Sequence, residues 1–94
     1  MRIRKCVLKY SMIYMNIKEA CTRRFEQICL ERKIKYNELA NLSGVTPSTV
    51  YSMMDARRHD LSIITIKKLC DGLDMPIYDF FNSEIFDELE QEIE

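Results

Sequence analysis

The chain has 94 residues, of which 47% are hydrophobic, enough for one core of four or five helices and too few for two independent cores. Its formal net charge is −1, and no apolar run approaches the ~20 residues that a membrane-spanning helix requires. The basic N-terminus lacks both an unbroken apolar run and a small-residue cleavage site, so the sequence predicts one cytoplasmic domain.

The near-neutral total hides a strong separation of charge along the chain. Residues 1–60 hold twelve Lys or Arg against six Asp or Glu, whereas residues 61–94 hold two against nine. One end of the protein is able to face phosphates while the other repels them. The net charge therefore does not exclude nucleic acid as a partner.

The cysteines and the single histidine do not form a recognisable metal-binding pattern. Cys6, Cys21, Cys29 and Cys70 show no C-x-x-C spacing, and His59 stands apart from them in a loop. We expect reduced thiols that act as small apolar residues on helix faces. No P-loop glycine pattern and no nucleophile–base pair is present either, so the sequence predicts a protein without metal, cofactor or enzymatic activity.

Residues 1–16 form a basic segment with three interpretations. Alternate apolar residues such as Leu8 and Tyr10 would line one face of a strand. The cations would equally suit a flexible arm that reaches nucleic acid. Alternatively, Met15 is the biological start, because it opens the first clear helix pattern, and the preceding residues are incidental or disordered.

Residues 17–33 have the spacing of an amphipathic helix. Apolar residues recur at three- and four-residue steps, at Ile17, Ala20 or Cys21, Phe25, Ile28 and Cys29. Charged residues fall largely on the opposite side. We expect Ile34 to pack beneath the connection to the next helix.

Residues 36–42 and 47–55 predict two short helices that cross tightly. Ala40 is small enough for close approach, and Gly44 allows a left-handed turn between the helices. Pro47 suits the first position of the second helix, whose Val50 and Met53 face inward. This is the residue pattern of a helix-turn-helix.

The following segment predicts two more helices after a loop that carries Arg57 and Arg58. Ser62 is a suitable N-cap for a helix over 63–72. Its apolar face comprises Ile63, Ile66, Leu69, Cys70 and Leu73. Pro76 starts a short fifth helix over 76–82 with apolar Ile77, Phe80 and Phe81.

Residues 83–94 form an acidic tail with an apolar stripe at Ile85, Phe86, Leu89 and Ile93. The spacing predicts a further helix over 83–93 or a helical tail. Its stripe has three possible partners, namely a second copy of the chain, a different protein, or the core of the domain itself.

The segments ELANLSGVTPSTVYSMM and LSIITIKKLCDGLDMPIYDFF, in this order, resemble the Cro/C1-type (xenobiotic-response-element type) helix-turn-helix family of bacterial and phage repressors. The resemblance covers about residues 17–81. It implies an all-α bundle of five helices that binds double-stranded DNA, usually as a homodimer. The chain then divides into the basic segment 1–16, the helix-turn-helix domain 17–82 and the tail 83–94.

Two positions depart from the family pattern. Tyr36 stands where the family usually has a glutamine that helps to hold a phosphate. Ala56, Arg57 and Arg58 follow the second helix of the motif, where the family often has a glycine.

In a helix-turn-helix, the second helix of the motif enters the major groove with its N-terminal residues nearest the bases. The base-facing candidates are Thr46, Pro47, Ser48, Tyr51, Ser52 and Asp55. None is Arg, Lys, Asn or Gln, the residues that make bidentate contacts with bases, so we expect modest direct readout. The candidate phosphate contacts are Lys35, Tyr36, Thr49, Arg57 and Arg58.

These features predict a sequence-specific DNA-binding transcriptional regulator, most simply a repressor. The alternative is a protein-interaction module or the antitoxin of a toxin–antitoxin pair, with weak DNA binding and a protein partner bound through residues 83–94. The two hypotheses differ in the salt dependence of duplex binding, because phosphate contacts must release counterions.

Overall fold

A computed structural model describes residues 15–93 of the chain. This part is all-α and contains no strand. Its elements are α2 (Ile17–Arg32), α3 (Tyr36–Ser43), α4 (Pro47–Met54), α5 (Ile63–Gly72), α6 (Ile77–Phe81) and the 3-10 turn η1 (Glu84–Asp87). The five-helix prediction is confirmed, with each helix end within one residue of its expected place. The interpretations of residues 1–14 lie outside the described residues.

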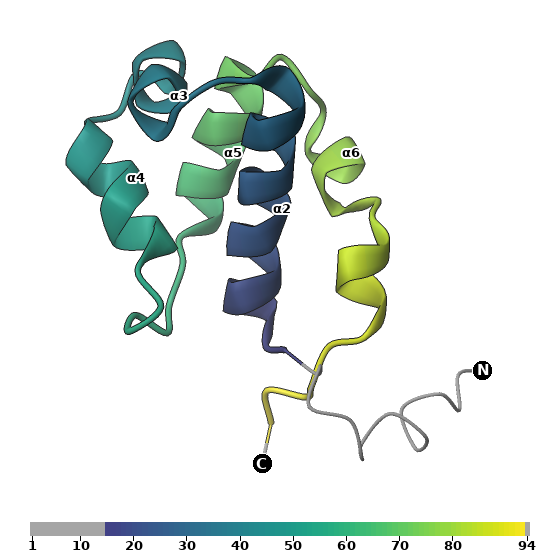
Figure 1. Ribbon diagram of the computed structural model, residues 1–94. Coiled ribbons are helices and arrows are strands. Elements are labelled where there is room, and N and C mark those ends of the chain that lie inside the picture. Colours follow the sequence, from purple (N-terminus) through teal and green to yellow (C-terminus); the bar gives the residue numbers. More distant parts are fainter. Residues whose placement is uncertain (1–14, 94) are drawn as a thin grey trace.

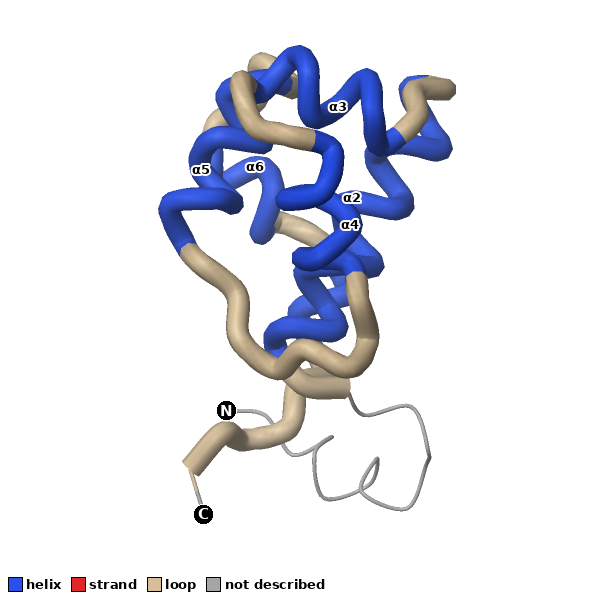
Figure 2. The backbone as a smooth tube through the Cα atoms, turned by 90° about the vertical axis from the view of Figure 1, so that its left-hand side faces the viewer, coloured by secondary structure: helices blue, strands red, loops and turns tan. Residues whose placement is uncertain are grey.

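The helices are arranged around α2 and α5. In Figure 1, the α3–α4 pair lies on one side of these two helices, and α6 with η1 lies on the other. Figure 2, turned by 90°, places α4 toward the viewer with a long loop leading from it to α5. Among the described elements, α4 therefore lies at the outside of the bundle. None of the described helices is long and apolar enough to cross a membrane.

Local signals explain most of the helix boundaries. Asn16 caps α2 by accepting a hydrogen bond from the Glu19 N–H at 2.8 Å. Ser62 caps α5 as expected, since its hydroxyl accepts from the N–H groups of the second and third residues of that helix. Lys33 closes α2 in the left-handed conformation, with φ of 59°.

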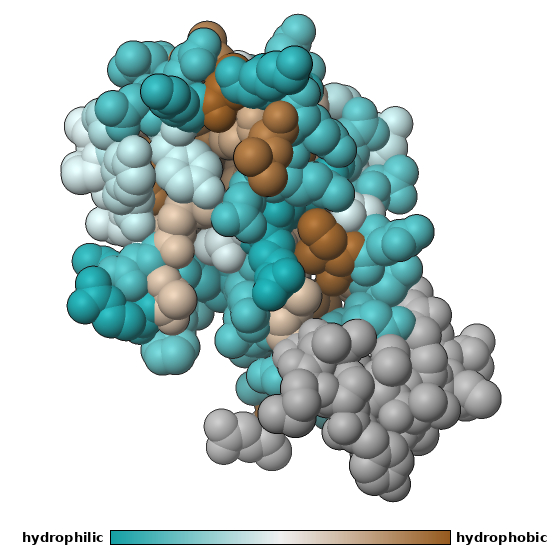
Figure 3. Space-filling model, in the orientation of Figure 1, coloured by the Kyte–Doolittle hydropathy of each residue, from teal (hydrophilic) through white to brown (hydrophobic). Residues whose placement is uncertain are grey.

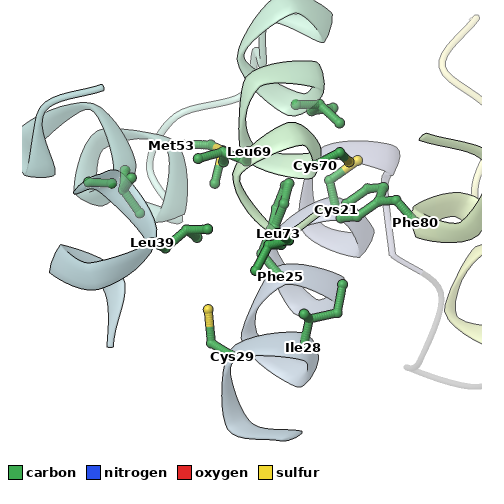
Figure 4. Packing of buried hydrophobic residues seen from close by; sticks show 13 residues of the cluster. Cys21, Phe25, Ile28, Cys29, Leu39, Met53, Leu69, Cys70, Leu73 and Phe80 are labelled. Carbon is green, nitrogen blue, oxygen red and sulfur yellow. The ribbon is translucent and has the colours of Figure 1, made fainter. Parts of the chain in front are cut away.

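The core is built from all five helices, as Figure 4 shows for ten labelled residues. Phe25, Leu39, Leu69 and Phe80 have no exposed surface. Ile34 packs against the core as predicted. The positions buried as predicted are Ala20, Cys21, Phe25, Ile28, Cys29, Ala40, Val50, Met53, Ile66, Leu69, Cys70 and Leu73.

Two apolar positions differ from the prediction. Ile63 is 58% exposed and Ile17 is 38% exposed, although both fall on the expected apolar faces. Each is the first residue of its helix. The first apolar residue that is buried comes one turn later, at Ile66 in α5 and at Ala20 in α2.

Gly72 marks the closest approach of α5 to α3. A Cβ at this position would lie 2.2 Å from Ser43 Oγ and 2.9 Å from Ser43 Cα. No real Cβ contact is that short, so only glycine lets the two helices pack at this separation. The sequence pattern placed Gly72 at a helix end and missed this packing role.

The further helix expected over 83–93 does not form. Only η1 is helical there, capped by Ser83, whose hydroxyl accepts from the Ile85 N–H at 3.3 Å. Beyond it the chain is extended, because Leu89 forms a parallel bridge with Met15 and the Glu90 N–H donates to the Met15 carbonyl at 3.1 Å. Backbone pairing of this kind is incompatible with a helix over the same residues.

The apolar stripe of the tail is consequently divided. Phe86 packs on α6, with its ring 5.8 Å from that of Phe80 and 5.0 Å from that of Phe81. Ile93 is 81% exposed. Phe86 therefore completes the core of the domain, whereas the end of the stripe contributes nothing to it.

Three cations of α2 donate hydrogen bonds to carbonyl oxygens at the ends of three other helices. The bonds run from Lys18 Nζ to Asp55 (2.6 Å) after α4, from Arg32 Nη1 to Leu73 after α5, and from Arg24 Nε and Nη2 to Phe80 (2.7 Å) and Asp79 (2.9 Å) in α6. Carbonyls at a helix C-terminus carry partial negative charge and lack partners within the helix. Since α4, α5 and α6 have no basic residue in their own last turns, α2 provides these cations.

Candidate nucleic-acid interface

The turn between α3 and α4 is built as the sequence predicts. Gly44 has φ of 71°, a left-handed conformation that costs a glycine little. The Val45 N–H donates to the Ala40 carbonyl at 3.1 Å, which ties the turn to the end of α3. Val50 and Met53 bury the inner face of α4. The outer face of α4 is thus held in a fixed orientation.

A cluster of hydroxyls occupies the N-terminus of α4. Thr46 is the N-cap, and its Oγ1 accepts from the Thr49 N–H at 3.3 Å. The same oxygen lies 3.0 Å from Ser48 Oγ and 3.0 Å from Thr49 Oγ1. These hydroxyls are able to rotate toward a ligand, because each both donates and accepts hydrogen bonds. Pro47, exposed beside them, adds no donor.

Two tyrosines connect α3 to α4. The Tyr51 ring is 54% exposed and meets the Tyr36 ring edge to face, at 5.7 Å between centroids. Tyr36 packs against the core, and this burial raises the pKa of its phenol. The packing of its ring against Tyr36 therefore helps to orient the exposed Tyr51 side chain. In Figure 3, which has the orientation of Figure 1, the surface on the α3–α4 side is mostly hydrophilic or of intermediate hydropathy.

Asp55 and Arg57 form one unit just after α4. Asp55 Oδ1 accepts from the Arg57 backbone N–H at 2.9 Å and from Nε at 3.1 Å, and Oδ2 accepts from Nη2 at 2.9 Å. These hydrogen bonds lower the pKa of Asp55 to about 2. The sequence assigned Asp55 to bases and Arg57 to phosphates, whereas the structure pairs them with each other.

A polar hollow lies between α4 and the beginning of α5. Three predicted residues, Thr49, Ser52 and Arg58, line it together. Its other lining residues are Met53, Asp60, Leu61, Ser62 and Thr65. Sequence reasoning placed Ser52 with the base-facing residues and missed Ser62 and Thr65 as contact candidates. The signal for Thr65 was its position one turn after the cap, on the same side of α5.

The other predicted contact residue is Lys35, which precedes α3. Lys35 is exposed and occupies the N-cap position without a capping side chain. It lies beside Tyr36 along the wall of a second hollow, which Tyr51 also lines. The predicted contact residues therefore flank α4 on two sides.

The thiols of the described chain are buried, as expected for small apolar residues. Cys21, Cys29 and Cys70 form no disulfide, and burial raises the pKa of Cys21 to about 11. These thiols remain protonated at neutral pH. Within residues 15–93, no group of His, Cys, Asp and Glu is arranged to hold a metal ion. His59 lies in the loop between α4 and α5.

The bundle and its two-helix motif define a helix-turn-helix protein. A model of the Cro/C1-type HTH DNA-binding domain matches residues 24–84, well over half of the chain. The chain therefore belongs to the Cro/C1-type helix-turn-helix family, and DNA binding follows from this membership. No curated protein is similar enough to count as a match.

Proposed function

We propose that the protein is a cytoplasmic, sequence-specific transcriptional regulator, a repressor that inserts α4 into the major groove of its operator as a homodimer. The observation that carries this proposal is the polar outer face of α4, which begins in a hydroxyl cluster and is fixed from within by Val50 and Met53. Palindromic operators match two-fold protein symmetry, which is why a homodimer is the expected assembly.

Base readout falls to the exposed residues at the start of α4. Thr46, Pro47 and Ser48 are exposed at the N-terminal end of α4. In a helix-turn-helix this end of the recognition helix lies nearest the base edges. Hydroxyls both donate and accept, so they discriminate weakly between base pairs. Tyr51 offers an apolar edge for thymine methyl groups. Specificity therefore depends partly on DNA shape and deformability.

Phosphate binding falls to the two sides of α4. On one side, Arg58 lies by the polar hollow with the hydroxyls of Thr49 and Ser52. On the other side, Lys35 and Tyr36 begin α3. Phosphate oxygens accept hydrogen bonds from hydroxyls and from cations alike. In this arrangement, each side of α4 contacts the phosphates of one of the two DNA strands that border the major groove.

The second candidate is an interaction module or antitoxin with weak DNA binding. It is favoured by the pairing of Asp55 with Arg57, which engages one of the two loop arginines and neutralises its charge beside α4. Ile93, exposed at the end of the acidic segment, offers an apolar contact for a protein partner.

Binding of duplex DNA at a series of salt concentrations separates the two candidates. For the regulator, we expect log K to fall linearly with log salt concentration. Arg58→Ala is expected to reduce this slope by about 1 and to weaken binding to all sequences alike. Arg57→Ala serves as the matched control with a smaller effect, because Asp55 already holds that side chain. Affinity without salt dependence would exclude the regulator.

Selection of bound DNA from a random pool tests the placement of the reading surface. We expect Tyr51→Ala to relax the selected sequence at one or two positions, at a cost below the ~1–3 kcal/mol of a bidentate base contact. Tyr51→Phe keeps the ring and should keep the preference. If both variants select the same sequences as the original chain with equal affinity, Tyr51 lies outside the reading surface.

A further inference from the structure

Lys18 occupies an unusual place for a charged residue. It is only 6% exposed and is the single charged side chain among the buried residues of the described part. It also stands in the first turn of α2, where the partial positive charge of the helix N-terminus disfavours a cation. Both features destabilise a lysine unless a strong acceptor compensates.

The acceptor is the carbonyl oxygen of Asp55, 2.6 Å from Lys18 Nζ. Asp55 is the C-cap of α4, where the chain leaves the helix. The carboxylate of the same residue holds Arg57, and Arg58 follows in the loop. One lysine thus fixes the backbone from which both loop arginines extend.

Among residues 15–93, Lys18 makes the side-chain hydrogen bond that joins α2 to this loop. Two hollows lie on either side of Lys18, and Lys18 lines both of them. One has Glu19 and Thr22 of α2 on one wall and Ala56 and Arg58 of the loop on the other. Both α2 and the loop thus line these hollows, and the Lys18 hydrogen bond joins the two segments there.

We propose that Lys18 is a positioning residue for DNA recognition, which holds the end of α4 and the following loop so that Arg58 reaches the phosphate backbone. This inference rests on the proposed function. Lys18 makes no contact with DNA itself in this scheme. Its removal leaves α4 in place through Val50 and Met53 but releases the loop.

The test compares Lys18→Met with Arg32→Met. Each substitution removes one bond from α2 to a helix-terminal carbonyl, at the end of α4 in the first case and of α5 in the second. We expect Lys18→Met to weaken binding of a selected duplex about tenfold and to lower the salt slope, since the orientation of Arg58 is lost. Arg32→Met should keep the affinity within about twofold at a temperature where both variants are folded.

Coupling to Arg58 distinguishes positioning from general destabilisation. In the Lys18→Met background, Arg58→Ala should weaken binding much less than it does in the original chain, because the arginine no longer acts. Lys18→Arg should restore most of the affinity. If Lys18→Met does not fold, Lys18→Ala, which also removes the hydrogen-bond donor, replaces it. Unchanged affinity in the variant, or a full effect of Arg58→Ala there, overturns the proposal.

Hydrogen exchange of the backbone amides measures whether Lys18 holds the loop, and this measurement does not require DNA binding. Amides from Asp55 to Arg58 should exchange faster in Lys18→Met and should be unaffected by Arg32→Met. If the original chain shows no salt-dependent binding of DNA, the regulator is excluded, while exchange still reports whether Lys18 holds the loop. Equal protection of these amides in both variants excludes the positioning role even where DNA binding is intact.

Discussion

Phe80→Ala is expected to lower the free energy of unfolding by about 3–5 kcal/mol, the largest effect of any single truncation considered for this protein. Phe80 has no exposed surface. Its ring lies 4.3 Å from that of Phe25 on α2 and 4.9 Å from that of Phe81. Truncation would leave a cavity between α6 and α2 that rigid neighbours cannot fill. Urea denaturation followed by circular dichroism measures the loss.

Phe86→Ala is the matched comparison, because Phe86 joins the same aromatic group from the tail but is only partly buried. We expect a smaller loss, of about 1–2 kcal/mol. No loss from this truncation would mean that the tail does not complete the core. Phe80 belongs to α6 and Phe86 to η1. These two elements lie across the bundle from α4 (Figure 1), so neither substitution should change the DNA sequence preference of the folded protein.

Gly72→Ala is expected to destabilise the fold even though alanine is the better helix former. The gain in helix propensity is about 1 kcal/mol, whereas overpacking costs about 1–3 kcal/mol. The added Cβ would meet the backbone of Ser43, with Cα and N both at 2.9 Å, so movement of a side chain alone cannot relieve the contact. The variant is compared with the original chain by thermal and urea unfolding.

Gly44→Ala provides the contrasting control. A Cβ at Gly44 would find no atom within 4 Å, but φ of 71° strains any residue with a side chain. Ser43→Gly should recover part of the stability lost in Gly72→Ala, because it removes Ser43 Oγ, and should recover none of that lost in Gly44→Ala. Equal recovery in both backgrounds would contradict the assignment of the Gly72 effect to α3–α5 packing.

The elements of the fold were predictable because local chemistry determines them. Gly44 and Pro47 define the two sides of the turn, and Ser62 begins α5, without reference to the rest of the chain. The tail was not predictable in this way. Its apolar spacing suits a helix, but pairing of Leu89 with Met15 makes the backbone extended, and a contact across the whole chain leaves no trace in periodicity.

The candidate site follows the same division. Thr46 and Ser48 could be placed at the start of α4 from the motif alone, and the structure has them there. The pairing of Asp55 with Arg57 depends on how the chain leaves the helix, which the sequence does not specify. Lys18 was expected among solvated charges, because its burial requires the loop after α4 to cross the start of α2. The contacts of the candidate site residues with DNA remain predictions.

The cations of α2 also make the small helices depend on one another. Helices as short as α4 and α6 are not stable alone, and their terminal carbonyls are held by Lys18 and Arg24 of the longest helix. Loss of α2 from the bundle therefore removes a side-chain donor from the ends of three helices at once. Because one helix stabilises the ends of the other three, we expect the described domain to unfold in a single cooperative transition.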